Sequence, residues 1–345
     1  MRIPGLGKLQ RVTDTIKNRL ISGGIILMYH RIDEPPNDPC RVCVSPRHFS
    51  EQLEVLSRHC RILPLQEMVE MAQARKPLEQ TVAITFDDGY ADNLLTAKPL
   101  LEKYNAPATM FVPTGNWNRN QEFWWDALER VFLQPGHLPQ RLRLEISGDV
   151  YEWDLGEVAD YSEADFERDR TWTIYTAANA DPTIRHSIYR SLSRLCFPLP
   201  EPERQNLLTQ LASWSGIEST TRLTHRSLSP EEVRQLGDGS LIEIGAHTVY
   251  HPPLSTLSAT LQQQEIQQGK AALETLLGYS ISSFAYPYGN YNTQTLDVMR
   301  TTDFACACST KASKVVHTSN CFELPRVEVQ NWDGEAFARW FVKWL

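Results

Sequence analysis

The chain alternates short apolar runs with longer amphipathic segments. The apolar runs at 25–30, 82–86 and 108–113 predict buried strands, and helical patterns begin at Ser45 and at Ala91 between them. Strands that alternate with helices pair in parallel through right-handed crossovers. This part of the chain therefore predicts an α/β fold, built either as a barrel or as an open doubly wound sheet.

The same alternation returns in the C-terminal third. Residues 241–247 read as a strand, a long helical pattern follows, and further strands are predicted at 304–309 and 324–329. Residues 116–235 have a different pattern of apolar and polar residues, with several amphipathic helical segments and no cluster of catalytic residue types. We expect one catalytic domain over residues 1–345, with 116–235 as a mostly helical insertion within it.

Unusual polar residues follow the apolar strands directly. His30, Asp87, Asp88, His247 and the YPYG turn at 286–289 each come just after the C-terminal end of a predicted strand. In a parallel barrel these strand ends converge on one face, where functional sites are built. We therefore expect residues that are far apart in the sequence to form a single site.

Composition and charge narrow the function classes. The chain is 41% hydrophobic and 22% charged, and its 42 acidic and 34 basic residues give a net charge of −8, which argues against nucleic acid as the ligand. No apolar stretch is long enough to span a bilayer and no signal-peptide pattern begins the chain, so we expect a cytoplasmic protein. The seven cysteines then favour reduced thiols over disulfides.

The segment HTVYH suggests a metal site. Its two histidines, His247 and His251, can face one point if the segment turns as a helix does. Two histidines and one carboxylate form a common divalent-metal site that leaves positions open for water and substrate. Either Asp87 or Asp88 could be the carboxylate. A cation would stabilise one ionised aspartate while the other acts as a base, whereas without a cation the two buried charges would repel each other.

The motifs TFDDGY, HTVYH and AYPYG together resemble those of the polysaccharide deacetylase family, also called the NodB-homology domain or carbohydrate esterase family 4. Residues 85–89 and 247–251 match the family motifs T-F-D-D-G and H-[ST]-x-x-H without substitution. The resemblance covers about residues 25–115 and 236–330 and leaves out the insertion. It implies a distorted (β/α) barrel with about seven strands and one divalent metal ion, zinc by preference, with cobalt, nickel or iron as alternatives.

The resemblance also implies a role for each motif residue. Asp87 would be the general base that takes a proton from the attacking water. The backbone N–H near Tyr288, next to Pro287, would stabilise the oxyanion. The metal ligands would be Asp88, His247 and His251.

Two features depart from the family pattern. The late L-x-x-H motif that supplies the general acid in many members is missing, and the context of His317 does not match it. The early MYHR is similar to the Y-H motif of the permuted poly-N-acetylglucosamine deacetylases, so we assign His30 as the acid. Ala285 stands where an arginine normally orients the catalytic aspartate. Arg326 could replace that arginine through a bidentate contact to Asp87, or form an ordinary surface salt bridge.

Three further segments carry weaker signals. Asp92 and Asn93 are expected to cap or solvate the helix that follows them. Trp117, Trp124 and Trp125 could stack on a sugar ring or pack as core, and adjacent tryptophans on an amphipathic helix favour core. Residues 1–24 form a basic amphipathic pattern that could rest on an anionic membrane surface or pack on its own domain.

These patterns lead us to expect a metal-dependent hydrolase that removes an N-acetyl group from an amino sugar, in a glycan or in a lipid- or nucleotide-linked precursor. An O-acetyl ester, a formamido sugar or a cyclic amide remains an alternative substrate for the same site. A non-catalytic glycan-binding module is the alternative of another class, and the intact metal and base residues argue against it. Contact with the inner face of the membrane is expected only if residues 1–24 bind lipid, and the sequence does not indicate an oligomeric state.

Overall fold

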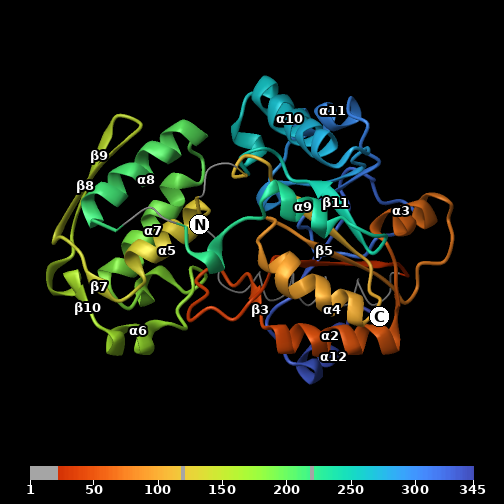
Figure 1. The fold of residues 1–345 in the computed structure, drawn as a ribbon, viewed down its shortest axis with the longest axis horizontal. Helices are drawn as coiled ribbons and strands as arrows, with labels where there is room; N and C mark the ends of the chain where they lie inside the picture. The colour runs from red at the N-terminus through yellow and green to blue at the C-terminus, as the bar shows by residue number, and fades with distance from the viewer. Residues whose placement is uncertain (1–21, 118–120, 218–220) are drawn as a thin grey trace, which may run out of the picture. The chain divides into compact units, whose positions relative to one another are not determined.

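The computed structural model describes residues 22–117, 121–217 and 221–345 (Figure 1). The described chain forms two compact units. Unit 2 consists of Pro35–Val42 and Gly115–Ser227, and unit 1 is made of the described residues before, between and after these segments. The chain is back in unit 1 from Leu228 onward, and the Leu228 N–H donates to the Gly89 carbonyl at 2.9 Å. The basic pattern predicted at 1–24 lies, through residue 21, outside the described residues.

Unit 1 is built around one parallel sheet. Its strand order is β13-β12-β11-β6-β5-β1-β14, with β4 also paired to β5. This arrangement, with helices between most consecutive strands, confirms the distorted barrel predicted from the sequence. The strands are β1 Ile25–Tyr29, β4 Arg61–Ile62, β5 Thr81–Phe86, β6 Ala108–Val112, β11 Ile242–Ala246, β12 Ser283–Ala285, β13 Cys306–Cys308 and β14 Val327–Glu328.

The central strands are apolar at nearly every position because both faces of the sheet are covered. Every residue of β1, β5 and β6 is buried. Parallel strands of this kind read as continuous apolar runs rather than as alternating patterns. Outside the main sheet, β2 Arg31–Ile32 pairs in parallel with β3 Cys43–Val44.

The helices of unit 1 begin and end at the residues that the sequence marks. The Ser45 hydroxyl accepts a hydrogen bond from the His48 N–H at 3.2 Å and starts α2, while Gly278 ends α10 in a left-handed conformation with φ 78°. In Figure 1, α12 lies beside α2 and α10 beside α11. The helices are α2 Pro46–His59, α3 Leu65–Gln73, α4 Lys98–Lys103, α9 Pro230–Leu236, α10 Ala259–Leu277, α11 Thr293–Arg300 and α12 Gly334–Phe341.

The single helix expected after Ala91 is divided. A π-helix spans Asn93–Ala97, and α4 follows it directly. Pro99 has no backbone N–H to donate into the preceding turn, so a regular helical ladder cannot continue through it. Short π-helical turns occur frequently at functional sites, and this one begins at a residue that contacts the candidate site.

Unit 2 combines helices with two antiparallel strand pairs. Residues 141–146 alternate exposed and buried positions, and Leu142, Leu144 and Ile146 enter the core of the unit. Trp125 is also buried and stacks on Phe123, which favours the core role predicted for it. The elements are α5 Trp124–Phe132, β7 Gly136–His137, β8 Arg141–Ile146, β9 Asp149–Asp154, β10 Asp160–Tyr161, α6 Glu163–Asp169, α7 Ile184–Cys196 and α8 Glu201–Ser215.

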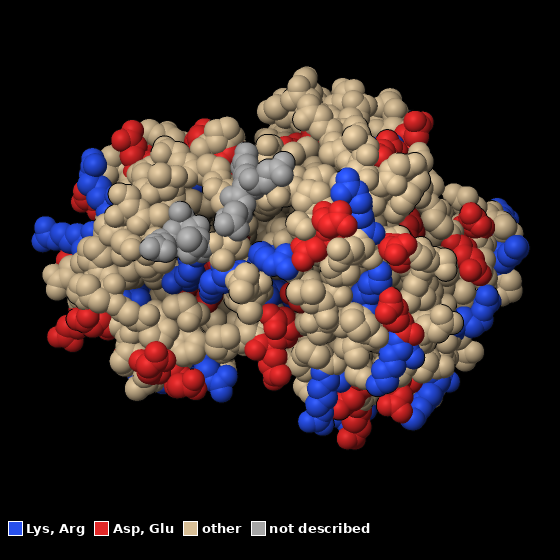
Figure 2. Space-filling model, in the orientation of Figure 1, with Lys and Arg blue, Asp and Glu red and all other residues tan. Residues whose placement is uncertain are grey.

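Surface charges of both signs are mixed. Over the described part of the face shown in Figure 2, Lys and Arg side chains alternate with Asp and Glu side chains. Pairs such as Arg58–Glu54 on α2 are largely exposed and contribute little to stability. None of the helices within the described ranges is both long enough and apolar enough to cross a membrane.

Candidate functional site

The strand ends of unit 1 bring most of the candidate residues together. Asp87 and Asp88 follow β5, and the Asp87 N–H donates to the Tyr29 carbonyl at the end of neighbouring β1 at 3.0 Å. His30 comes directly after Tyr29, and His247 comes directly after β11. The convergence expected from the sequence therefore follows from the parallel pairing of these strands.

Asp88, His247 and His251 form a buried cluster of three potential metal ligands. The Asp88 Oδ1 lies 3.1 Å from the His251 Nε2 and 3.5 Å from the His247 Nε2. One ligand atom from each residue lies within 4.8 Å of the other two. Donor atoms that bind one ion at about 2.0–2.1 Å lie about 3–3.5 Å apart, so this spacing suits a small divalent cation.

The hydrogen bonds of His247 prepare its ring for a metal. Its Nδ1 lies 2.8 Å from the carbonyl oxygen of Ala285, which can only accept, so Nδ1 carries the proton. The lone pair of the imidazole is then on Nε2, the atom that faces Asp88. A backbone carbonyl that fixes the tautomer in this way is a common feature around metal-binding histidines.

The electrostatics of the cluster keep the ligands in their metal-binding forms. Burial by itself would raise the pKa of Asp88, but the positive charge of a protonated His251 holds that pKa well below its usual value, and a bound cation in place of that proton would act on Asp88 in the same direction. Burial lowers the pKa of His251, although the neighbouring Asp88 opposes the shift. An ionised carboxylate beside a neutral imidazole is the donor set that a divalent cation requires.

Arg326 pairs with Asp87 from inside the barrel. Its two terminal nitrogens lie 2.7 Å from the two carboxylate oxygens, a bidentate contact, and its side chain is fully buried. Its Nε also donates to the Ser309 carbonyl at 3.0 Å, and one terminal nitrogen donates to Thr85 Oγ1 at 3.2 Å. Burial alone would raise the pKa of Asp87, but the Arg326 charge lowers it, so Asp87 is held as an oriented, ionised carboxylate.

Arg326 belongs to the segment 324–329 that the sequence predicts as a strand. It directly precedes β14, whose Val327 is paired with Leu27 in the middle of β1. Its long side chain therefore extends along the barrel interior to Asp87. Ala285 is buried at the end of β12, and its side chain offers no group that could orient an aspartate.

The segment after β1 is fixed by residues of the DDGYADN stretch. The Asn93 Nδ2 donates to the His30 carbonyl at 2.8 Å. Asp92 accepts from the Ile32 N–H at 2.9 Å and forms an ion pair with Arg31 at 3.0 Å. The positive charge of His30 is also among the groups that lower the pKa of Asp87.

The helix-capping role predicted for Asp92 and Asn93 is therefore wrong. Asp92 makes no side-chain capping hydrogen bond, and Asn93 is already the first residue of the π-helix. Their side chains point instead to a strand segment about sixty residues earlier in the chain. Nothing in the local sequence signals this, because an aspartate and an asparagine before a helix are ordinary capping residues.

The HTVYH segment is a strained loop and not the helical turn that the histidine spacing suggested. Thr248 has φ 66° and His251 has φ 55°, in the left-handed region. Asp88 with φ 73° and Tyr288 with φ 57° share this conformation at the same site. Non-glycine residues are held there at an energetic cost, and such residues cluster at functional sites.

Tyr288 lies beside the metal-ligand cluster. Its ring centre is 4.5 Å from that of His251 with an interplanar angle of 72°, and 36% of the residue is exposed. Pro287, the residue before it, is buried. The ring of Tyr288 is therefore partly exposed next to the metal-ligand cluster.

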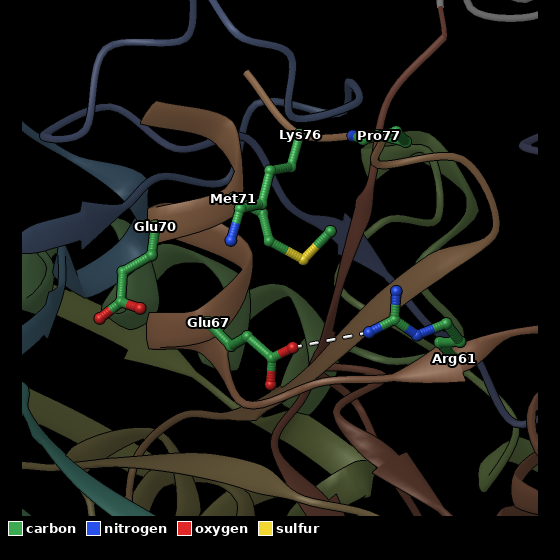
Figure 3. Close-up of a pocket in the computed structure, with 6 residues that line it drawn as sticks. All are labelled: Arg61, Glu67, Glu70, Met71, Lys76 and Pro77. Atoms are coloured by element: carbon green, nitrogen blue, oxygen red, sulfur yellow. Dashed lines mark ion pairs between the residues drawn. The ribbon is translucent and has the colours of Figure 1, made fainter. Parts of the chain in front are cut away.

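His317, the other histidine considered as the general acid, lies away from the candidate site. The charge of His317 acts on Glu79, which precedes the start of β5, whereas the candidate site is at the end of that strand. A surface cavity of about 380 Å³ lies at this same end of the sheet (Figure 3). One of its lining residues, Arg61 of β4, is paired with Thr81, the first residue of β5. The Arg61–Glu67 pair in the cavity spans 3.6 Å and is largely exposed. The cavity is lined by Arg61, Glu67, Glu70, Met71, Lys76 and Pro77.

Comparison with known proteins identifies the family. The family model "Polysaccharide deacetylase" matches residues 74–138 and 209–307, two segments that contain the DDG and HTVYH motifs. The chain belongs to the polysaccharide deacetylase family. His30 and Arg326 both lie outside the matched segments, so the candidate acid and the partner of the candidate base come from parts of the chain that this family model does not match.

Individual deacetylases extend the comparison. A Bacillus subtilis protein named "Putative polysaccharide deacetylase YxkH" is 36% identical over 89 residues, which is 25% of this chain and 30% of that protein. The structure of the deacetylase PplD from Streptococcus pyogenes, in complex with acetate, has a TM-score of 0.56 at 18% identity, covering 92% of this chain and 97% of that one. IcaB from Ammonifex degensii gives 0.56 at 19% identity, with 94% and 98% covered. At these identities the two structures show a shared fold.

Proposed function

We propose that this polysaccharide deacetylase family member is a metal-dependent hydrolase that removes the N-acetyl group from an amino sugar, in a glycan or in a glycan precursor. The observation that carries the proposal is the pair of adjacent aspartates with separate partners. Asp88 lies against His247 and His251, while Asp87 is held by Arg326. This separation supports Asp88 as a metal ligand and Asp87 as a base.

The residues of the chain divide the proton transfers between them. Asp87 accepts a proton from a water molecule while the oxygen of that water adds to the amide carbonyl carbon. The C–N bond then breaks, and His30 supplies the proton that the departing nitrogen needs, which yields acetate and a free amine. A divalent ion held by Asp88, His247 and His251 would act as a Lewis acid toward the carbonyl and lower the pKa of water in the site.

Support for an acetylated amino sugar comes from the family to which the chain belongs and from the names of its relatives. The chain's own geometry supports hydrolysis at an acyl carbon, because it combines a buried metal-ligand cluster with an oriented base. Zinc is the ion we propose, since two imidazoles and one carboxylate are a donor set that zinc binds in catalytic sites.

Metal content and acetate release together test the proposal. Elemental mass spectrometry of the purified protein should find about one divalent ion per chain, and the His247→Ala variant should lose it. Acetate should be released from N-acetylglucosamine oligomers by the metal-loaded wild-type protein. A wild-type protein that takes up no zinc, cobalt or nickel would contradict the proposal and favour a glycan-binding module. If acetate were released only from O-acetylated sugars, the activity would be that of an esterase and not of an amidase.

A further inference from the structure

The loop that carries the two histidines is fixed from outside by helix α10. Glu265, on the second turn of that helix, accepts hydrogen bonds from two consecutive backbone amides, those of Val249 and Tyr250. Both bonds end on the same carboxylate oxygen, and each is 2.9 Å long. The two amides lie between His247 and His251, so this carboxylate binds the middle of the metal-ligand loop.

A second feature of α10 brings the helix close to the same loop. Gly269 is one helical turn beyond Glu265, on the same face of the helix. A Cβ atom at Gly269 would lie 2.8 Å from both the carbonyl carbon and the carbonyl oxygen of Thr248. Only a glycine allows the backbone of Thr248 to pack this closely. Helix α10 therefore contacts the loop with a carboxylate and a glycine in adjacent turns.

The loop needs this support because its backbone is strained. Thr248 and His251, the residues on either side of the two bonded amides, are both left-handed. The Thr248 hydroxyl oxygen accepts a hydrogen bond from the His251 N–H at 3.0 Å, which closes the turn from within. Left-handed threonine and histidine are held only where surrounding contacts enforce them. The bonds to Glu265 supply such contacts, and a negative charge suits two amide dipoles that point to one atom.

We propose that Glu265 is a positioning residue that sets the metal affinity of the site by holding the His247–His251 loop in its ligand geometry. The inference rests on the proposed metal site but concerns a residue that touches neither metal nor substrate. Without the carboxylate, the amides of Val249 and Tyr250 lose their acceptor, and the loop can relax toward ordinary backbone angles. The two imidazoles then leave the spacing that places both within 3.5 Å of Asp88.

Metal binding by Glu265 variants tests the proposal. Zinc affinity of the full chain would be measured by competition with a chromophoric chelator for wild type, Glu265→Ala, Glu265→Gln and the control Gln263→Ala, an exposed position on the same helix. We expect Glu265→Ala to raise the zinc Kd about tenfold to a hundredfold, as loss of outer-shell partners does at other metal sites. Glu265→Gln keeps one acceptor oxygen and should fall between, and Gln263→Ala should match wild type.

Two further readouts separate positioning from general stabilisation. At saturating zinc, Glu265→Ala should regain most of the wild-type kcat, because the base, the acid and the metal ligands are intact. In the metal-free protein, hydrogen exchange at the Val249 and Tyr250 amides should speed up in Glu265→Ala while the strands of the sheet stay protected. Gly269→Ala should also weaken zinc binding, since the new methyl group displaces Thr248.

The outcomes are distinguishable. An unchanged zinc Kd in a folded Glu265→Ala protein would overturn the proposal, as would unchanged exchange at the two amides. If Glu265→Ala does not fold, Glu265→Gln and Gly269→Ala carry the same test through zinc affinity. A wild-type protein without metal affinity would refute the proposed function, and the exchange measurement would still decide whether Glu265 holds the loop.

Discussion

At the scale of single residues, two neighbouring aspartates have different partners. Asp88 is in the left-handed region with φ 73°, so its side chain diverges from that of Asp87. Asp88 points to two imidazoles, and Asp87 points to a guanidinium. Each carboxylate therefore has its own cationic or hydrogen-bonding partners, which prevents the repulsion that two adjacent buried charges would otherwise suffer.

The Asp87→Asn substitution should separate chemistry from metal binding. The amide cannot take a proton from water, so kcat should fall by about 10²–10⁴-fold, the range typical of general bases. Zinc content should stay at the wild-type level, because the ligands of the proposed ion are untouched. Deacetylation rates and elemental analysis on the same preparation would show this, and an Asp87→Asn enzyme that keeps its rate would remove Asp87 from the mechanism.

The Arg326–Asp87 pair should behave as a buried pair in a thermodynamic cycle. Arg326→Met leaves the Asp87 carboxylate buried without its main partner, which should cost about 3–5 kcal/mol of unfolding free energy. Adding Asp87→Asn to that variant removes the unpaired charge and should recover part of the loss. Urea denaturation of the wild type, both single variants and the double variant measures the coupling. Additive effects would mean that the two side chains do not interact.

At the scale of elements, the short segment after β1 and the π-helix depend on each other. Asn93 begins the π-helix and donates a hydrogen bond to the His30 carbonyl. Asp92 accepts a hydrogen bond from the Ile32 N–H and forms an ion pair with Arg31, the two residues of β2. The Arg31 guanidinium also stacks 4.6 Å from the centre of the Tyr90 ring. The backbone of His30, the proposed acid, is thus held in place by the first residue of the π-helix.

Substitutions in this contact should affect the acid step selectively. His30→Ala should lower kcat for N-acetyl sugars about 100-fold or more, because the leaving amine loses its proton donor. It should largely spare 4-nitrophenyl acetate, whose leaving group needs no proton. Asn93→Ala should show the same pattern in a weaker form, with zinc content unchanged. If both substrates slowed equally in His30→Ala, the general acid would have to be another residue.

The sequence predicted the elements with the strongest local signals. Strands such as β5 are continuous apolar runs, and α2 begins at a serine followed by proline. The alternation of residues 141–146 was also visible, yet it lay in a segment read as helical. The loop geometry at His251 and the partners of Asp92 could not be predicted, because left-handed residues and contacts across sixty positions are set by tertiary structure rather than by local propensity.

At the scale of the whole molecule, all residues of the candidate site belong to unit 1, although unit 2 interrupts unit 1 in the sequence. The metal-ligand cluster draws Asp88 from before the interruption and His247 and His251 from after it. The last strand of the main sheet before unit 2, β6, and the first strand after it, β11, are direct neighbours in the sheet. The sheet register therefore assembles the site across the interruption.

Unit 2 should make the stability of the protein sensitive to acid. Burial lowers the pKa of His186 to about 4, and the residue is 3% exposed, packed 4.8 Å from the Trp172 ring. Since an unfolded histidine has a pKa near 6.5, the unfolded chain binds more protons between these values, and stability is lost as the pH falls from about 6.5 to about 4. The full loss is about 3 kcal/mol.

Urea denaturation at several pH values would measure this dependence. His186→Gln should flatten the slope between pH 6.5 and 4, because the substituted residue has no proton to bind. The wild type and the variant should keep a constant difference in unfolding free energy above pH 7.5. An equal slope in both proteins would assign the acid sensitivity to other groups.

The parallel pairing of β6 with β11 has a consequence for synthesis on the ribosome. The 129 residues between Val112 and Ile242 must be translated before β6 can gain its second neighbour. At about 5–20 residues per second this takes about 6–26 seconds. During that time the nascent chain carries β1, β5 and β6 with two open apolar edges, one on β6 and one on β1, because β14 is also still to be translated. Identical nascent chains can pair at such edges, and molecular chaperones recognise them.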